Sequence, residues 1–227
     1  MQSRTTSDRA STPLASHSDV RIHPTAIIEE NVRIGAGTSV WDNVHIRHGT
    51  SIGEECIIGE KSYIAYDVTI GNRVKINAFV YICTAVTIEE GVMISAGTVF
   101  TNDRFPRAAT SDLKRLRPSD PDEDTLPTRV CAGATIGAHC TIGNDLEIGR
   151  FAMVGMGTLI TKSVLDFHLV IGHPARSVGY VCRCGRVLAM ISNLDPTAAS
   201  KLTCAACGLG YARLEGRITE LTPPSQV

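Results

Sequence analysis

Residues 68–100 read VTIGNRVKINAFVYICTAVTIEEGVMISAGTVF and carry a large apolar residue at every sixth position. A six-residue period fits neither a 3.6-residue helix nor the simple alternation of an ordinary strand. It fits a solenoid, in which short strands alternate with sharp turns and each repeat points one large side chain inward. One coil cannot bury its own apolar face, so coils must stack and share a core. The sequence therefore predicts an all-β solenoid.

The same period extends outward from this stretch in both directions. It starts at Ile22, stops after Phe100 and resumes at Val130. The inward positions it predicts are Ile22, Ile28, Ile34, Val40, Ile46, Ile52, Ile58, Ile64, Ile70, Ile76, Ile82, Ile88, Ile94, Phe100, Val130, Ile136, Ile142, Ile148, Val154 and Ile160. Glycine often follows the apolar residue, as at Gly35, Gly53, Gly59 and Gly137. We expect these glycines to serve corners with positive φ, which is cheap only without a Cβ.

Composition narrows the functional classes. The formal net charge is -1, from 22 basic and 23 acidic residues, so the basic excess of a nucleic-acid or membrane-surface binder is absent. No apolar run approaches the roughly 18 residues that a membrane span requires. Residues 1–19 are rich in Ser and Thr and lack the apolar stretch of a signal peptide, so we expect a disordered tail. A cytoplasmic protein with eight unpaired cysteines follows as the expectation.

The repeat is interrupted by TNDRFPRAATSDLKRLRPSDPDEDTLPTR, residues 101–129. This segment is polar, contains several prolines and has no apolar period. A loop this long inside a compact domain is usually functional or disordered. A solenoid can eject such a loop from one corner because each coil contacts only its neighbours. We expect the loop to wall off a pocket, with a tolerated insertion as the alternative.

The repeat resembles that of the hexapeptide-repeat acyltransferases, and the resemblance covers residues 20–178. It implies a left-handed parallel β-helix with three faces per coil, a homotrimer, and active sites in the clefts between neighbouring prisms. TKSVLDFHLVIGHPARSVGY resembles the family's exit from the last coil. We therefore expect a left-handed β-helix over residues 20–178 and a separate C-terminal segment over residues 179–227.

VFTNDRFPRA, residues 99–108, resembles a motif of the subgroup that N-acetylates amino groups on nucleotide-linked sugars. NRVKINAFV, residues 72–80, and IHPTAII near the start are similar to other segments of that subgroup. The resemblance implies transfer of an acetyl group from acetyl-CoA to a UDP- or dTDP-linked 3-amino sugar. A thioester is already activated, and no G-x-S-x-G nucleophile elbow occurs, which favours direct attack in a ternary complex. Such a site needs a neutral amine, an oxyanion donor and two reactants held together.

The candidate acceptor residues lie at the loop root. Asn102 can accept from the amine and donate to a sugar oxygen without adding charge, although an Asn there can also simply form a turn. Asp103 can take the proton from the ammonium, or it is simply solvated. Arg107 suits a sugar carboxylate or a pyrophosphate, with a loop-folding ion pair as the alternative. Asn77 and Trp41 complete the predicted substrate contacts.

Histidine is the usual base in the wider family, because its pKa lies near working pH. His45 and His48 flank the inward Ile46 in SVWDNVHIRHG and should point outward, and His139 is a weaker candidate. We rank His45 first, while ordinary surface roles and a reaction without a protein base both remain open. For the coenzyme, which the family holds against later coils, the candidates are Gly155, Gly157, Lys162 and Arg176.

After residue 180 the pattern changes to VCRCGRVL and then LTCAACGLGY. Cys182, Cys184, Cys204 and Cys207 form a C-x-C and a C-x-x-C pair, each followed by Gly. Four thiolates suit a closed tetrahedral Zn²⁺ site that stabilises a small segment. Unbound thiols and a redox pair are the alternatives. We predict a structural zinc in a ribbon-like segment.

Three other functions compete with the amino-sugar assignment. A zinc carbonic anhydrase uses the same solenoid, but it needs three converging histidines, and the later coils offer only His139. An acyltransferase for a small amine or hydroxyl acceptor needs no bulky acceptor pocket. A non-catalytic nucleotide-sugar-binding solenoid would tolerate changes in TNDRFPRA without loss of activity.

Overall fold

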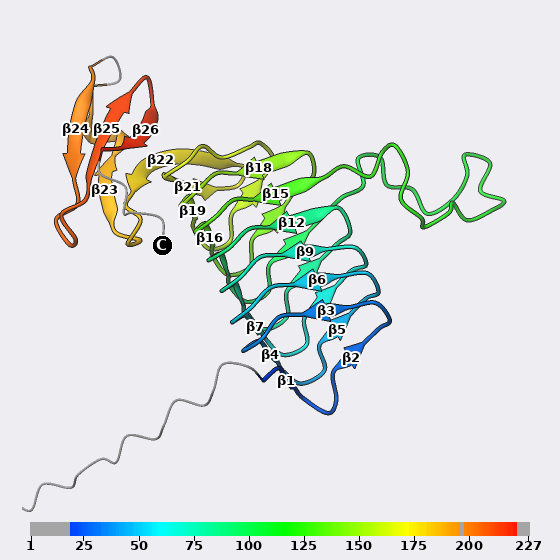
Figure 1. The fold of residues 1–227 in the computed structure, drawn as a ribbon. Coiled ribbons are helices and arrows are strands. Elements are labelled where there is room, and N and C mark those ends of the chain that lie inside the picture. The colour runs from blue at the N-terminus through cyan, green and yellow to red at the C-terminus, as the bar shows by residue number, and fades with distance from the viewer. Residues whose placement is uncertain (1–18, 196–197, 222–227) are drawn as a thin grey trace, which may run out of the picture.

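The computed structural model describes residues 19–195 and 198–221. Within these residues it contains 26 strands and a single 3₁₀ turn, η1 (Ile191–Asn193). None of the described segments forms a helix long and apolar enough to cross a membrane. The chain winds into a parallel solenoid, as the repeat predicts, with the three faces that the family resemblance implies, and a small antiparallel unit follows it (Figure 1).

Three parallel sheets form the faces of the prism, and each coil places one short strand on each face. Face A contains β1 (Arg21–Ile22), β4 (Ser39–Val40), β7 (Ile57–Ile58), β10 (Lys75–Ile76), β13 (Met93–Ile94), β16 (Thr135–Ile136) and β19 (Met153–Val154). Face B contains β2 (Ile27–Ile28), β5 (His45–Ile46), β8 (Tyr63–Ile64), β11 (Tyr81–Ile82), β14 (Val99–Phe100), β17 (Thr141–Ile142) and β20 (Leu159–Ile160). Face C contains β3 (Arg33–Ile34), β6 (Ser51–Ile52), β9 (Thr69–Ile70), β12 (Val86–Ile88), β15 (Thr128–Val130) and β18 (Leu146–Ile148).

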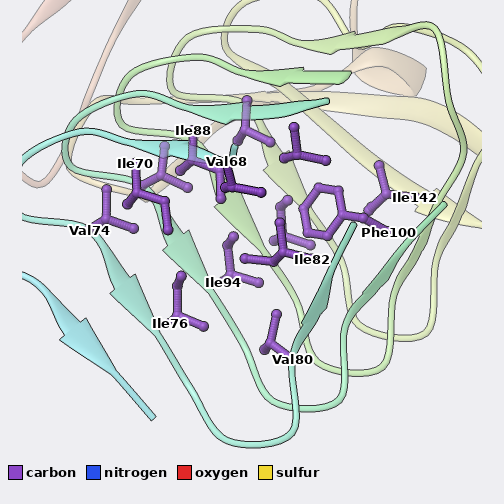
Figure 2. Close-up of a cluster of buried hydrophobic side chains, with 14 of the residues drawn as sticks. Val68, Ile70, Val74, Ile76, Val80, Ile82, Ile88, Ile94, Phe100 and Ile142 are labelled. Carbon is purple, nitrogen blue, oxygen red and sulfur yellow. The ribbon is translucent and has the colours of Figure 1, made fainter. Parts of the chain in front are cut away.

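The apolar residue of each repeat faces the inside of the prism. Ile64 pairs with Ile82 one coil away, and both are fully buried. Figure 2 shows Ile76, Ile82 and Ile94 pointing into a common interior with Phe100. The expected inward positions are buried from Val40 onward, whereas Ile22 in the first coil is 45 % exposed. Burial of one large apolar side chain per strand gives each coil its share of a continuous core.

The glycines that follow the apolar residues have a different role from the predicted one. Gly35, Gly53, Gly59 and Gly137 do not have positive φ. Instead, the backbone of the next coil passes so close that a Cβ on Gly35 would lie 2.5 Å from the carbonyl carbon of Gly53. These positions therefore require glycine because of close approach between coils. The positive-φ corners lie two residues later and accept other residues, such as Lys61 at φ 58°.

The interruption leaves the prism at the corner between faces B and C, after β14 and before β15. The coils on either side keep their register, since Phe100 pairs with Ile142 and Ile88 with Val130. Residues 101–127 extend away from the prism (Figure 1). Isolated bridges join Asp103 to Thr125 and Ala109 to Leu116, so the two limbs of the loop run together.

Face A continues into the C-terminal unit through β21 (His168–Gly172), β22 (Ala175–Val181) and β23 (Val187–Met190). A separate sheet of β24 (Ser200–Thr203), β25 (Gly210–Leu214) and β26 (Arg217–Glu220) packs beside them. Strand β22 crosses the boundary expected at residue 178, so the two units share this strand. The ends of the expected segments 1–19 and 179–227, residues 1–18 and 222–227, lie outside the described residues.

Candidate functional site

Face B carries a row of outward rings. His45, Tyr63 and Tyr81 occupy equivalent positions on β5, β8 and β11. The His45 ring meets Tyr63 edge-on with centroids 5.4 Å apart, and Tyr63 stacks on Tyr81 at 5.2 Å. A second stack, His48 on Tyr66 at 5.3 Å, lies at the neighbouring corner. Both predicted histidines therefore lie on the outside of the prism, each against a tyrosine of the next coil.

Glu29 joins these rings into one network, and sequence reasoning missed it. Its carboxylate accepts from His45 Nε2 at 2.8 Å and from His48 Nδ1 at 3.1 Å, and it pairs with Arg47 Nε at 2.5 Å. Arg47 also donates to the Tyr63 hydroxyl at 2.9 Å. The Arg47 hydrogen bond, together with those from His48 and His45, lowers the pKa of Glu29 to about 2. The coil length of 18 residues, which places residue 29 beside residue 47, was the available signal.

The loop root encloses a small polar cavity of about 100 Å³. Asn102, Asp103 and Arg107 line it together with Tyr66 and Thr84, and the returning limb, residues 117–125, closes it. Asn102 Nδ2 donates to the carbonyl of Thr84 at 3.3 Å, which leaves the side-chain oxygen facing no protein donor among the described residues. The structure therefore brings three predicted residues together: Asn102, Asp103 and Arg107.

Hydrogen bonds within the loop hold these side chains in place. The Asp103 carboxylate accepts the N–H of Phe105 at 3.2 Å, and Arg107 donates to the carbonyl of Pro106 at 2.9 Å. The N–H of Leu126 donates to the Asn102 carbonyl at 2.8 Å. No ion pair of Arg107 occurs within the described residues, and its only recorded side-chain hydrogen bond there is to the loop backbone.

Trp41 and Asn77 share a different hollow, at the corner between faces A and B. It has a volume of about 310 Å³ and includes Ile57, Gly59 and Ala96 in its wall. This corner and the Asn102 corner flank the same face, B. The predicted acceptor residues are thus divided between the two edges of face B.

His45 and Asn102 do not meet within one chain. His45 pairs with Tyr63, Tyr63 with Tyr81 and Tyr81 with Val99, so three coil steps separate them. At a strand spacing of about 4.8 Å these steps amount to about 14 Å. His45 therefore lies too far away to take a proton from an amine held at Asn102 of the same chain.

The coenzyme candidates are also divided between corners. Gly155 and Gly157 follow β19 at the corner between faces A and B, and the exposed His139 follows β16 at the same corner one coil earlier. Lys162, two residues after β20, is exposed in the same corner column as Asn102. Arg176 lies on β22 and donates to the carbonyl of its neighbour Ala175 at 2.8 Å. Gly157 has φ 69° and open space around it, which suits a close ligand.

The four C-terminal cysteines converge as predicted. One sulfur from each of Cys182, Cys184, Cys204 and Cys207 lies within 4.8 Å of the others. The Cys182–Cys207 and Cys184–Cys204 sulfur distances are 3.4 and 3.6 Å. A tetrahedron of sulfurs about 2.3 Å from a Zn²⁺ has edges near 3.8 Å, so these positions fit such an ion.

The four thiols differ in their electrostatic surroundings. Backbone N–H groups of Cys207 and Ala206 lower the pKa of Cys204 to about 6, whereas burial raises the pKa of Cys182 to about 12. Four thiolates cannot lie together at these distances without a positive charge between them. Within residues 19–195 and 198–221 of a single chain, this is the group of potential ligands that geometry brings together, and the histidines form none.

Another hollow lies away from every predicted residue. It covers about 630 Å³ on face C, beside Thr128, Glu147 and Ser163. Arg129 on its floor pairs with Glu89 and lies 3.8 Å from Glu147. Because Arg129 is already paired with Glu89 and the hollow is open to solvent, we do not place the chemistry there.

Comparison with known proteins supports the repeat assignment. Residues 31–66 and 67–102 match the bacterial transferase hexapeptide (six repeats) family, and residues 49–84 match the hexapeptide repeat of succinyl-transferase. A dTDP-3-amino-3,6-dideoxy-alpha-D-galactopyranose 3-N-acetyltransferase of Aneurinibacillus thermoaerophilus is 38% identical over 94 residues, 41% of this chain and 45% of that protein. Serine acetyltransferase 4 of Arabidopsis thaliana is 43% identical over 49 residues, 22% of this chain and 14% of that protein.

A solved structure shares the fold. AntD, an N-acyltransferase from Bacillus cereus in complex with dTDP and 3-hydroxybutyryl-CoA, matches with a TM-score of 0.50 and 22% identity. The match covers 73% of this chain and 81% of that one. The chain spans less than half the length of the curated relatives it matches, 45% and 14%. The chain thus carries hexapeptide repeats similar to those of bacterial transferases, and its three-sided parallel prism shares the fold of AntD.

Proposed function

We propose that this protein is an acyl-CoA-dependent N-acetyltransferase whose acceptor is the amino group of a nucleotide-linked amino sugar of the UDP- or dTDP-3-amino type. The observation that carries the proposal is the placement of Asn102, Asp103 and Arg107 around one small polar cavity beneath the loop. The 38% identical relative is named as an acetyltransferase of a dTDP-3-amino sugar, and AntD was solved with dTDP and an acyl-CoA.

In this proposal the residues of the loop root act on the acceptor. The Asn102 side-chain oxygen accepts a hydrogen bond from the amine and orients its lone pair towards the thioester carbon. The amine attacks, the carbonyl oxygen becomes an oxyanion, and the C–S bond breaks to release the coenzyme thiolate. The proton lost by nitrogen passes to Asp103, to the leaving sulfur or to solvent. Arg107 holds a carboxylate or pyrophosphate oxygen of the acceptor.

His45 is the other candidate for the proton. Because Nε2 bonds to the Glu29 carboxylate, that nitrogen carries the hydrogen in the neutral ring, and Nδ1 is the basic one. A carboxylate that orients an imidazole is a common arrangement around catalytic histidines. Since His45 lies about three coil steps from Asn102, it would serve an acceptor whose amine is held nearer to the first coils. We propose a homotrimer with a shared cleft, as the resemblance to the hexapeptide-repeat acyltransferases implies.

The proposal places acetyl-CoA along the later coils. Gly155 and Gly157 offer bare backbone, while Lys162 and Arg176 are exposed cations available for phosphate oxygens. We propose that the protein acts in the cytoplasm, where reducing conditions keep its cysteines as thiols or metal ligands. Neither a nucleic acid nor a membrane is needed as a partner.

Thiol release from acetyl-CoA tests this function, with a panel of UDP- and dTDP-linked amino sugars as acceptors. We expect turnover with at least one amino sugar and a loss of about 10²- to 10³-fold in kcat/KM for Asn102→Ala. Asn72→Ala, at the corner between faces C and A, is the matched control and should keep full activity. No turnover with any amino sugar, or equal activity of Asn102→Ala, would overturn the assignment.

A small amine or hydroxyl acceptor is the second candidate. It is favoured by the 43% identity, over 49 residues, to a protein named serine acetyltransferase 4. Serine and other small amines therefore belong in the same acceptor panel. Turnover of serine alone would favour this alternative, and no turnover of any acceptor, together with saturable binding of nucleotide sugars, would favour a non-catalytic solenoid.

We also propose that Cys182, Cys184, Cys204 and Cys207 bind one structural Zn²⁺. A closed four-sulfur site leaves no position for substrate, so the ion would stabilise the C-terminal unit and take no part in catalysis. Elemental analysis of natively purified protein should give about one zinc per chain, and Cys204→Ser should remove it. Protein that is fully folded without metal, with four thiols that react freely, would contradict the proposal.

A further inference from the structure

Trp41, the single tryptophan of the chain, forms one wall of the hollow at the corner between faces A and B. Its side chain is large and apolar, yet the residue is 52 % exposed. Ile57 beside it is 39 % exposed, and the hollow between them measures about 310 Å³. That volume is at the lower end of the range of small-molecule sites, about 300–1,000 Å³. A flat aromatic wall therefore borders a space of ligand size.

The hollow is open because several residues at the same corner on the following coils have small side chains or none. Val40 pairs with Ile58, and Ile58 with Ile76, so Gly59 and Asn77 follow Trp41 in the same corner column. A Cβ on Gly59 would lie 2.5 Å from the carbonyl carbon of Asn77, so this position must stay glycine. Ala78 and Ala96 continue the wall with small side chains. The backbone geometry of the prism thus fixes an empty space next to the indole.

Two polar groups border the same hollow without protein partners. Asn77 and Glu60 both line it, and neither side chain makes a hydrogen bond or ion pair within the described residues. A carboxamide offers a donor and an acceptor side by side, and a carboxylate offers acceptors only. The imide edge of a pyrimidine, or the amino edge of a purine, complements this pair, because it presents both a carbonyl or ring nitrogen and an N–H.

We propose that this hollow binds a nucleobase, which stacks on the indole of Trp41 and hydrogen-bonds to Asn77 and Glu60. The inference rests on the proposed function, because both reactants of that function contain a base. The base can come from the nucleotide of the acceptor or from the adenine of the coenzyme. The recognition chemistry is the same for the two sources, and the ligands used in the test separate them.

The single tryptophan makes the test direct, because all indole emission of the protein comes from Trp41. We would titrate the full-length protein with UDP, with dTDP and with adenosine 3′,5′-bisphosphate, and follow this emission. Ribose 5-phosphate and pyrophosphate, which lack a base, are the controls. Saturable quenching by a nucleotide, without an effect of the base-free controls, is the expected result. UDP or dTDP would identify the acceptor as the source, and the adenosine bisphosphate would identify the coenzyme.

Variants then test the residues by calorimetric titration of the nucleotide that binds. Trp41→Leu should weaken binding by about 5- to 150-fold, the range found when a stacking aromatic ring is removed. Asn77→Ala should weaken it as well, and it should reduce discrimination between bases. Phe79→Leu is the matched control, since Phe79 is an exposed aromatic residue of the same corner that does not line the hollow.

The outcomes separate this inference from the function on which it rests. Acyl transfer to an amino sugar without any nucleotide effect on Trp41 emission would overturn the nucleobase site and leave the function standing. Saturable quenching without acyl transfer would support the nucleobase site and overturn the proposed function. Equal affinity of Trp41→Leu and Phe79→Leu for the nucleotide would also overturn the inference.

Discussion

The guanidinium of Arg183 lies over the ring of Phe151, 4.4 Å from its centroid. Arg183 lies between Cys182 and Cys184 in the sequence, and its backbone N–H donates to the Tyr211 hydroxyl at 3.1 Å. That hydroxyl also contacts the Cys182 sulfur at 3.1 Å. Phe151 lies just before β19 in the last coil of the prism, so the Arg183 side chain connects the cysteine cluster to the solenoid.

Arg183→Ala should therefore loosen this junction. It removes the contact with Phe151 and the ion pair with Glu220, whose side chain is only 9% exposed. A partly buried cation–π contact contributes about 1 kcal/mol, which in a domain of this size corresponds to about 2–4 °C in Tm. Arg186→Ala, in the same turn but exposed and unpaired within the described residues, is the control for thermal unfolding. Equal Tm values for the two variants would contradict the connection.

Removal of the metal should affect the C-terminal unit far more than the prism. The small sheet β24–β26 has few buried apolar residues of its own, whereas the coils share one continuous core. After chelation we expect hydrogen exchange to quicken in residues 182–185 and 198–221, while the strands from β5 to β17 stay protected. Exchange that is unchanged throughout would show that the cysteines stabilise nothing.

Glu29 should make the first coils sensitive to acid. Its pKa is lowered to about 2, chiefly by Arg47, so its stabilising effect is complete above the ordinary glutamate value and is lost as pH falls towards 2. Urea unfolding of Glu29→Gln should show lower stability than wild type at pH 7, with the difference shrinking between pH 4.5 and 2. Glu30→Gln, exposed and without a side-chain partner in the described structure, should follow the wild type. A difference independent of pH would refute the electrostatic explanation.

The fold was predictable because one physical requirement repeats in every coil. Every sixth residue must be apolar to fill the interior, so the period is visible in the sequence regardless of which residues occupy the surface. Ile46, Ile64 and Ile142 are buried as expected. The close approach at Gly35 and Gly59 was not predictable in this way. Both positive φ and backbone contact select glycine, so the residue type alone does not reveal which of the two applies.

The candidate site was predictable only where neighbours in sequence are also neighbours in space. Asn102, Asp103 and Arg107 lie within one short segment and share a cavity. Glu29 is 16 to 19 residues from the histidines it binds, and Glu60 joins Trp41 only through the stacking of coils. Such contacts can be predicted from the coil length, provided that it is used to find the neighbours of polar residues as well as those of apolar residues.

The two roles of glycine can be separated by mutation. A Cβ on Gly137 would lie 2.5 Å from the backbone nitrogen of Met156. At Gly91 the nearest atom to such a Cβ is 3.9 Å away, and only the positive φ of 67° disfavours a side chain. Gly91→Ala should cost about 1–2 kcal/mol, the usual penalty for a left-handed residue. Gly137→Ala should cost more, because the coils themselves must move apart. Chemical denaturation of both variants gives the comparison, and a smaller loss for Gly137→Ala would contradict the packing argument.

The loop between β14 and β15 should prove dispensable for the fold and necessary for the acceptor. Its limbs come together at the Asp103–Thr125 bridge, so a short Gly/Ser linker can replace residues 105–123 without stretching the chain. Each coil packs only on its neighbours, and loop length changes closure entropy slowly, so we expect a Tm within a few degrees of wild type. The same deletion removes the limb that closes the cavity around Asn102.

Steady-state kinetics with both substrates show whether the loop helps to enclose the acceptor or is only a tolerated insertion. The deletion should raise KM for the acceptor strongly and leave KM for acetyl-CoA nearly unchanged, because the coenzyme candidates Gly155 and Gly157 lie at another corner and Lys162 lies two coil steps beyond Asn102. Leu113→Ser, a change at an 82 % exposed loop residue that does not line the cavity, should leave both constants alone. If the shortened protein binds its acceptor as tightly as wild type, the loop is an insertion that the solenoid merely tolerates.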